Sequence, residues 1–172
     1  AEESYGVYDE YSDHDDSIYY YLHSSDKLCS FMKEYEYQDA EETTQIRKYS
    51  EDMVKDVANV YIEETLGDAA LKYDFQKTEY QEQKGIYLVT YIRRIGNYIT
   101  DDSLVVFLDG NAEVYAFSAM NRDRYDGFGV NDIETQSLKY ALEAVEAGQY
   151  EMDDIRITMD TELQRLVAVL PK

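Results

Sequence analysis

The chain has 172 residues, of which 19 are tyrosine and none is tryptophan, and its formal net charge is −21. Such an acid excess creates a negative potential that disfavours nucleic acid and anionic lipid as partners. No apolar run approaches the roughly 20 residues that cross a bilayer, so no transmembrane segment is expected in the chain as given.

Residues 1–49 are predicted to form an acidic, tyrosine-rich N-terminal segment. Its first 46 residues hold thirteen acidic residues and only two lysines. Over residues 17–37 apolar side chains recur at helical spacing, which predicts one broken helix. Ser17 is the candidate N-cap, and Ser24-Ser25-Asp26 is the place where the helix could restart. The residues with this spacing are Ile18, Tyr21, Leu22, Ser25, Leu28, Cys29, Met32 and Tyr35.

Residues 50–172 are predicted to form an α+β domain that starts with a helix. Ser50 is the candidate N-cap of this helix, and Glu51 and Asp52 suit the positive N-terminal end of its dipole. Gly67 is expected to end the helix, because glycine readily adopts the conformation that follows the last turn. The apolar stripe of the helix comprises Met53, Val54, Val57, Ala58, Tyr61 and Ile62.

Four strand-like runs follow this helix. The alternation over Leu71–Gln76 predicts a half-exposed strand, and the nearly continuous apolar run Ile86–Ile95 predicts a strand covered on both faces. Residues 104–108 and 113–120 are expected to pair as a hairpin across the turn Asp109–Ala112. The segment 97–103 is expected to be a looser turn.

A further helix is predicted to start near Asn131, which has the spacing of a capping box with Glu134, and to end at Gly148. Two final strands are expected over residues 155–159 and 166–170. Consecutive strands joined by short turns predict an α+β fold, with an antiparallel meander sheet and helices packed on one face. The expected core residues are Val54, Val57, Tyr61, Leu88, Ile92, Val106, Leu142 and Ile157.

The capped helix and tyrosine-rich meander, with the phrase Asp101–Asn111 and a closing strand over Leu163–Leu170, carry a family resemblance. Together they resemble the PepSY-like and cystatin-like extracytoplasmic domains of Gram-positive bacteria, over residues 50–170. The resemblance implies export, a sheet curved around a helix, and binding or inhibition in place of catalysis. The opening residues Ala1-Glu2-Glu3-Ser4 suit either a cut signal peptide or an arbitrary boundary. An extracellular or cell-envelope location in a bacterium is therefore expected.

No catalytic motif is present: there is no G-x-S-x-G, P-loop, dinucleotide-binding or H-E-x-x-H pattern. Catalytic residues and cofactors are therefore not predicted. The segment 121–132 departs from the calcium-loop pattern, because Tyr125 takes a ligand position and arginines precede and follow Asp123. The acidic run 13–16, even with His14 and His23, matches no zinc spacing. No metal site is predicted, and Cys29, the one cysteine, is expected to be a small buried residue.

Three groups of residues are candidates for ligand binding. Tyr19, Tyr20 and Tyr21 are adjacent, so on a helix they cannot share one face, and at least one ring should be exposed or meet a partner. Tyr125 is expected to be exposed in a loop. The third group shares one face of a strand, which is either an aromatic binding face or a core covered by a helix. Its members are Tyr87, Tyr91 and Arg93.

Two main hypotheses of function follow. The first is a secreted or cell-envelope, non-catalytic binding module for a protein, a peptide or a cell-wall polymer. The alternative is a carbohydrate-active enzyme or carbohydrate-binding domain that uses carboxylates and tyrosines. Two carboxylates about 5–9 Å apart in an aromatic cleft would favour the enzyme. A third possibility is an acidic assembly domain whose N-terminal aromatic helix docks a partner.

Overall fold

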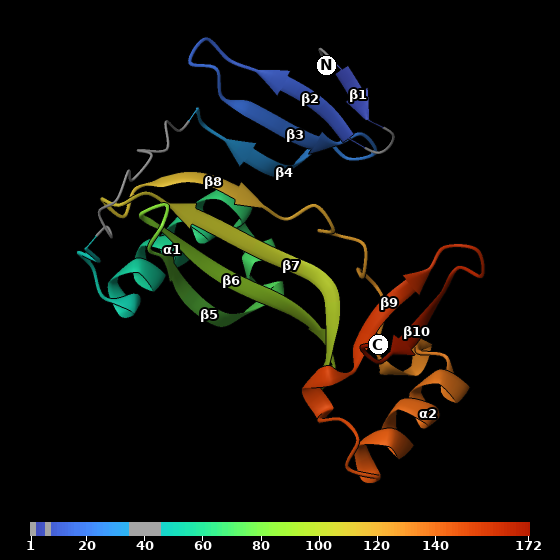
Figure 1. The fold of residues 1–172 in the computed structure, drawn as a ribbon. Helices are drawn as coiled ribbons and strands as arrows, with labels where there is room; N and C mark the ends of the chain where they lie inside the picture. Colours follow the sequence, from blue (N-terminus) through green and yellow to red (C-terminus); the bar gives the residue numbers. More distant parts are fainter. Residues whose placement is uncertain (1–2, 6–7, 35–45) are drawn as a thin grey trace. The chain divides into compact units, whose positions relative to one another are not determined.

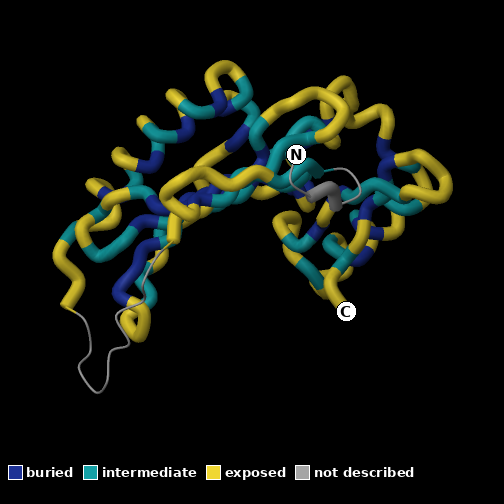
Figure 2. Tube along the Cα trace, turned by 90° about the horizontal axis from the view of Figure 1, so that it is seen from above, coloured by how far each residue is buried: buried dark blue, intermediate teal, exposed yellow. Residues whose placement is uncertain are grey.

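A computed structural model describes residues 3–5, 8–34 and 46–172 (Figure 1). The chain divides into two compact units: unit 1 comprises residues 1–91 and 103–122, and unit 2 comprises residues 92–102 and 123–172. The predicted boundary between residues 49 and 50 lies within unit 1. Buried residues occur on both helices and strands (Figure 2). The α+β class is confirmed.

Unit 1 consists of a meander sheet with one long helix and additional N-terminal strands. Its strands lie in the order β1-β2-β3-β4-β8-β7-β6-β5. The elements are β1 (Glu3–Tyr5), β2 (Tyr8–Ser12), β3 (Ile18–Leu22), β4 (Lys27–Met32), α1 (Glu51–Leu66), η1 (Gly67–Lys72), β5 (Tyr73–Gln81), β6 (Ile86–Ile95), β7 (Tyr98–Leu108) and β8 (Val114–Ser118). Strands β6 and β7 continue into unit 2.

Helix α1 begins and ends where the sequence predicts. The Ser50 side chain accepts a hydrogen bond from the Met53 amide at 3.3 Å, and Gly67 ends the helix with φ of +56°. The helix buries residues at every fourth position against the sheet: Val54, Ala58, Ile62 and Leu66. The prediction that Val57 belongs to the core is wrong, since its side chain is 39% exposed. Val57 lies next to Ala58 in the chain, so it projects about 100° around the helix from this buried face.

The predicted core is otherwise largely confirmed. Val54, Ile92, Val106 and Ile157 are buried. The remaining three predicted positions are partly buried: Tyr61, Leu88 and Leu142. Strand β6 is confirmed with its predicted bounds, and none of its ten residues is exposed.

The broken helix predicted over residues 17–37 is wrong, because its described part forms strands β3 and β4. Residues 35–37 lie outside the described residues. Two turns bound the strands. Before β3, the Asp13 side chain accepts hydrogen bonds from the amides of Asp15 and Ser17; before β4, Asp26 adopts a positive φ of 52°. Aromatic and β-branched residues between such turns favour strands over a helix.

The N-terminal strands are part of the sheet of unit 1. Strand β4 pairs antiparallel with β8, and Phe31 lies opposite Phe117. The buried Cys29 lies on β4, where its thiol donates to the Lys27 carbonyl at 3.4 Å, as expected for a small core residue. Residues 8–34 therefore extend the meander sheet.

In the meander, one predicted turn is confirmed and the predicted starts of two strands are wrong. The Asp109–Ala112 turn is confirmed at the tip of the β7–β8 hairpin, where the Asp109 carboxylate accepts from the Asn111 and Glu113 amides. The looser turn predicted over 97–103 is wrong, because β7 already starts at Tyr98. A tight turn at Gly96, with φ of +58°, leads directly from β6 into β7. The strand predicted from Leu71 starts later, at Tyr73, after η1.

Unit 2 contains the ends of β6 and β7, helix α2 and a C-terminal hairpin. Its remaining elements are η2 (Val130–Asp132), α2 (Thr135–Glu146), η3 (Met152–Asp154), β9 (Arg156–Asp160) and β10 (Arg165–Val169). Strands β9 and β10 pair antiparallel, whereas β9 runs parallel to the start of β7. This short parallel pairing departs from the predicted all-antiparallel sheet. It arises because a helix-containing connection of 47 residues, 109–155, separates β7 from β9.

Helix α2 starts later than predicted. Glu134, and not Asn131, is its N-cap, and the Glu134 carboxylate accepts from the Gln136 and Ser137 amides at 3.1 and 2.6 Å. Gly148 follows the helix with φ of +73°, as expected. The unit 2 core comprises Ile95, Tyr125, Ile133, Ala141, Ile155, Ile157, Leu166 and Ala168. Among the described residues, no helix has the length and apolar character to span a membrane.

Candidate functional site

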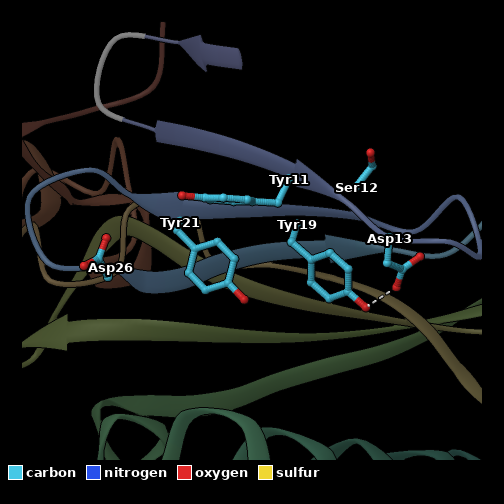
Figure 3. A pocket seen from close by; sticks show the side chains of 6 residues that line it. All are labelled: Tyr11, Ser12, Asp13, Tyr19, Tyr21 and Asp26. Atoms are coloured by element: carbon cyan, nitrogen blue, oxygen red, sulfur yellow. Dashed lines mark hydrogen bonds between the residues drawn. The ribbon is translucent and has the colours of Figure 1, made fainter. Parts of the chain in front are cut away.

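An open pocket of about 510 Å³ lies on the N-terminal strands of unit 1 (Figure 3). We call it the aromatic pocket. The side chains that line it come from β2, β3 and the two turns next to β3: Tyr11, Ser12, Asp13, Tyr19, Tyr21 and Asp26. It contains two of the three tyrosines predicted from the run 19–21.

Strand register explains why these rings meet. Tyr11 lies opposite Tyr19, and Asp9 lies opposite Tyr21. Since side chains alternate between the faces of a strand, Tyr19 and Tyr21 share a face and Tyr20 points to the other. The three rings do not face one way, but the reason is the alternation of a strand and not the predicted helix, and all three residues are half-buried.

The two outer rings form a corner. The rings of Tyr11 and Tyr21 are perpendicular, with centroids 5.5 Å apart, a favourable arrangement for aromatic pairs. Tyr11 is 39% exposed. The rings project from neighbouring strands into the same space (Figure 3), so they offer aromatic surface and hydroxyl groups to a ligand.

Tyr19 is held differently. Its ring packs on Phe31 at a centroid distance of 5.1 Å, and its hydroxyl donates to the Asp13 carboxylate at 2.8 Å. This hydrogen bond, followed by those from the Ser17 and Asp15 amides, lowers the pKa of Asp13. Asp13 is therefore an ionised carboxylate that closes the turn and fixes Tyr19.

The second carboxylate of the pocket belongs to Asp26, at the β3–β4 turn. Its backbone amide donates to the Leu22 carbonyl at 2.8 Å, which closes the turn. Within the described part of the chain, no hydrogen bond or ion pair engages its carboxylate. The residue is exposed, so this negative charge is available to a ligand.

Tyr125 is buried, and the prediction of an exposed ring is wrong. Its hydroxyl donates to the Asp101 carboxylate, which also accepts from Thr158 at 3.1 Å. Arg124 lies 3.6 Å from the same carboxylate. Burial, followed by the hydrogen bond to Asp101, raises the pKa of Tyr125. The ring anchors its loop within unit 2, because a buried hydroxyl needs a partner.

Tyr87 and Tyr91 are also buried, which confirms the helix-covered alternative for their face of β6. The Tyr87 hydroxyl accepts from the amides of Lys48 and Tyr49. The Tyr91 hydroxyl donates to Asn59 on α1 at 2.7 Å. Their burial removes both rings from the surface that a partner could reach.

Arg93, the third predicted residue of that strand face, belongs to unit 2. Its side chain is only 11% exposed and lies 2.9 Å from Asp126 and 3.8 Å from the buried Asp102. A buried carboxylate needs such a partner, since desolvation of an isolated charge is costly. Arg93 therefore has a structural role in holding Asp102 and the loop.

Sequence reasoning missed Tyr11, Ser12, Asp13 and Asp26 as parts of a site. The signal was present: aromatic runs at 8–11 and 18–22 flank Asp13–Ser17, a turn-forming segment. Read as a hairpin, this pattern places Tyr11 near Tyr19. Reading helical spacing concealed the pairing.

A second hollow of about 640 Å³ lies along α2 in unit 2, where Leu138 and Leu142 are flanked by charged residues. Of these, Lys139 and Glu143 pair with each other at 3.8 Å. In the part of the chain that the structure describes, no group of three or more histidine, cysteine or acidic side chains is placed to hold a metal ion.

No known family description matches the sequence, and no curated protein matches it. A solved structure, the Bacillus megaterium YpeB C-terminal domain, is similar in fold with a TM-score of 0.53. The two sequences are 9% identical, and the similarity covers 95% of this chain and 72% of the other. At this identity the likeness concerns the fold alone: this chain shares its overall α+β architecture with the YpeB C-terminal domain.

Proposed function

We propose that this protein is a PepSY-like, non-catalytic binding module that acts outside the cytoplasm, and that its ligand binds in the aromatic pocket. The ligand class is a protein, a peptide or a cell-wall polymer. The observation that carries the proposal is the perpendicular pair of accessible rings, Tyr11 and Tyr21, around an open hollow. The extracytoplasmic location rests on the fold likeness to the YpeB domain.

Tyrosine suits recognition for an energetic reason. The side chain offers a large amphipathic contact area, yet only two torsions must be fixed on binding. In the aromatic pocket, strand pairing between β2 and β3 already orders the backbone beneath the rings. A ligand therefore meets a preorganised surface, which lowers the entropic cost of binding.

The carboxylates of the pocket support binding more than catalysis. A glycosidase needs one carboxyl group with a raised pKa as its general acid. Asp13 has the opposite property, because the Tyr19 hydroxyl and backbone amides lower its pKa. A carbohydrate ligand remains the second candidate, since the exposed ring of Tyr11 offers a face to the apolar side of a sugar.

The proposal is tested with a panel of immobilised peptides and wall-type oligosaccharides. The double variant Tyr11→Ala/Tyr21→Ala should weaken every retained ligand at least tenfold, while Tyr140→Ala should not. Tyr140 is the matched control because its side chain is 69% exposed on α2. Binding that survives the double variant would place the site elsewhere. Ligands should also be recovered chemically unchanged by mass spectrometry, whereas cleavage would favour the enzyme.

A further inference from the structure

We infer that the aromatic pocket binds a cationic side chain, a lysine or arginine of a basic peptide. This inference rests on the proposed function, because it names the ligand class of the same pocket. It goes further by choosing a basic peptide over a neutral or acidic ligand. Three observations carry it: the charge of the pocket, the geometry of its rings and the charge of the chain.

The charge of the pocket is negative and only partly satisfied. Of the six described residues that line it, two are acidic and none is basic. Asp13 is engaged by Tyr19 and by two backbone amides. The Asp26 carboxylate has no such engagement among the described residues. A ligand that brings a positive charge would give Asp26 a partner, whereas an acidic ligand would be repelled by both carboxylates.

The geometry of the rings suits a cation. An aromatic ring carries negative charge on its faces, so an ammonium or guanidinium group above a face is attracted. Tyr11 and Tyr21 stand perpendicular at 5.5 Å, and together they form a two-sided aromatic corner. Figure 3 shows Asp26 on the side of the pocket toward which the Tyr11 hydroxyl points. The corner and the carboxylate thus border one hollow, so a single cationic side chain can use both.

The charge of the whole chain favours the same ligand. With a net charge of −21, the protein attracts cationic peptides over long range and repels anionic ones. This general attraction is diffuse, so it cannot by itself place a peptide in the pocket. A test must therefore separate local binding from diffuse attraction.

The experiment follows backbone amide signals of the ¹⁵N-labelled full chain by NMR. The probe is a capped peptide of alternating lysine and glycine, and its lysine-acetylated form is the neutral control. We expect saturable shifts at Tyr11, Tyr21 and Asp26 with the lysine peptide at low salt. The acetylated peptide should cause none. Uniform small shifts over all acidic surfaces, without saturation at the pocket, would overturn the inference.

Single substitutions test how much the Asp26 carboxylate contributes to binding of the lysine peptide. Asp26→Asn removes the charge yet suits the positive φ of 52° at this position, because asparagine tolerates that conformation. It should weaken lysine-peptide binding about two- to fivefold, the range of an exposed ion pair. Glu82→Gln removes the same charge at an exposed position before β6, far along the strand order from β3, and should have no effect. If both variants lost the same affinity for the lysine peptide, the peptide would be held only by diffuse attraction to the acidic protein.

The rings are tested in the same way. Tyr21→Leu should weaken binding of the lysine peptide, while Tyr21→Phe, which keeps the aromatic face, should retain most of it. The amide spectrum of each variant shows whether the fold is kept. Equal weakening by both substitutions would contradict the cation–π contribution.

Two further ligands distinguish a failure of this inference from a failure of the proposed function. If a β-1,4-linked N-acetylglucosamine tetramer shifts the pocket signals and the lysine peptide does not, the inference fails and the proposed function stands. If neither ligand nor any neutral peptide shifts them, both fail. If spermidine binds more tightly than the lysine peptide, the ligand is a free polyamine and the peptide assignment is wrong.

Discussion

The side chain of Tyr125 joins three segments of unit 2 through one hydroxyl group. It donates to Asp101 near the start of β7, and the same carboxylate accepts from Thr158 on β9. The ring itself is fully buried among the core residues of unit 2. A residue expected from sequence to be an exposed recognition ring is thus an anchor, and its energetic contribution can be measured.

Tyr125→Phe should lower the free energy of unfolding by about 1–2 kcal/mol, because it removes a hydrogen bond to a charged acceptor that stays partly exposed. Tyr140→Phe is the matched control on an exposed ring and should change stability by less than about 0.5 kcal/mol. Urea denaturation of both variants gives the comparison. An unchanged midpoint for Tyr125→Phe would mean that water fully replaces the hydroxyl.

Glu134 contributes to stability in a pH-dependent way. Hydrogen bonds from the Ser137 and then the Gln136 amide lower its pKa in the folded protein. Because the folded-state pKa is lowered, the contribution is complete above the ordinary glutamate pKa of 4.5. It is lost as the pH falls through the lowered value.

Glu134→Ala removes this cap, so the variant should melt about 2–4 °C below the unsubstituted protein at pH 7. The difference between the variant and the natural chain should shrink as the pH drops below 4.5. Calorimetry between pH 7 and pH 3.5 measures both effects. Glu146→Ala, at the last residue of α2, is the control, since a carboxylate there opposes the helix dipole. A pH-independent loss in Glu134→Ala would contradict the capping explanation.

At the scale of elements, α1 has a buried apolar stripe and an outer stripe of exposed apolar residues, Met53, Val57 and Val60. Val54 is fully buried against the sheet, whereas Val57 is 39% exposed. Val54→Ala should therefore cost about 1.5–3 kcal/mol of unfolding free energy, and Val57→Ala less than about 0.5 kcal/mol. The two variants change the same side chain in the same helix, so helix propensity cancels in the comparison. Equal losses would show that the outer stripe is also covered in solution.

The elements that were predictable from sequence have strong local signals. Ser50 and Gly67 define α1 because caps depend on a few neighbouring residues, and the apolar run Ile86–Ile95 matches β6 residue for residue. The turn at Asp109–Ala112 is likewise local. In each case the evidence for the element lies within the element itself.

The misread elements depend on pairing partners far along the chain. Residues 18–32 carry apolar spacing compatible with a helix, which masked the local hairpin signal, and the pairing of β4 with β8, more than 80 residues later, adds support for strands that no local pattern contains. Tyr87 and Tyr91, for which the sequence left both a binding face and a helix-covered core open, are core residues packed with α1. The aromatic pocket was half predictable: the tyrosine run was visible, but Tyr11 and Asp26 join it only through hairpin register.

At the scale of the whole molecule, the excess of negative charge opposes folding. The chain carries 37 acidic and 16 basic residues, and compaction brings like charges together. The ion pairs that the structure places on surfaces, such as Lys77 with Glu79 at 3.0 Å, are worth little individually. Screening by salt should therefore stabilise the folded state more than the loss of these pairs destabilises it.

We expect the melting temperature at pH 7 to rise when sodium chloride increases from 20 to 500 mM, since the Debye length falls from about 20 Å to about 4 Å. Glu82→Lys, which makes the net charge two units less negative at an exposed turn, should raise the melting temperature at low salt. Its advantage should shrink at high salt, because screening removes the repulsion that the substitution relieves. Glu82→Gln should give about half of the low-salt gain. A melting temperature that falls with salt would show that attractive ion pairs outweigh the net repulsion, and a salt-independent gain in Glu82→Lys would assign it to a local contact.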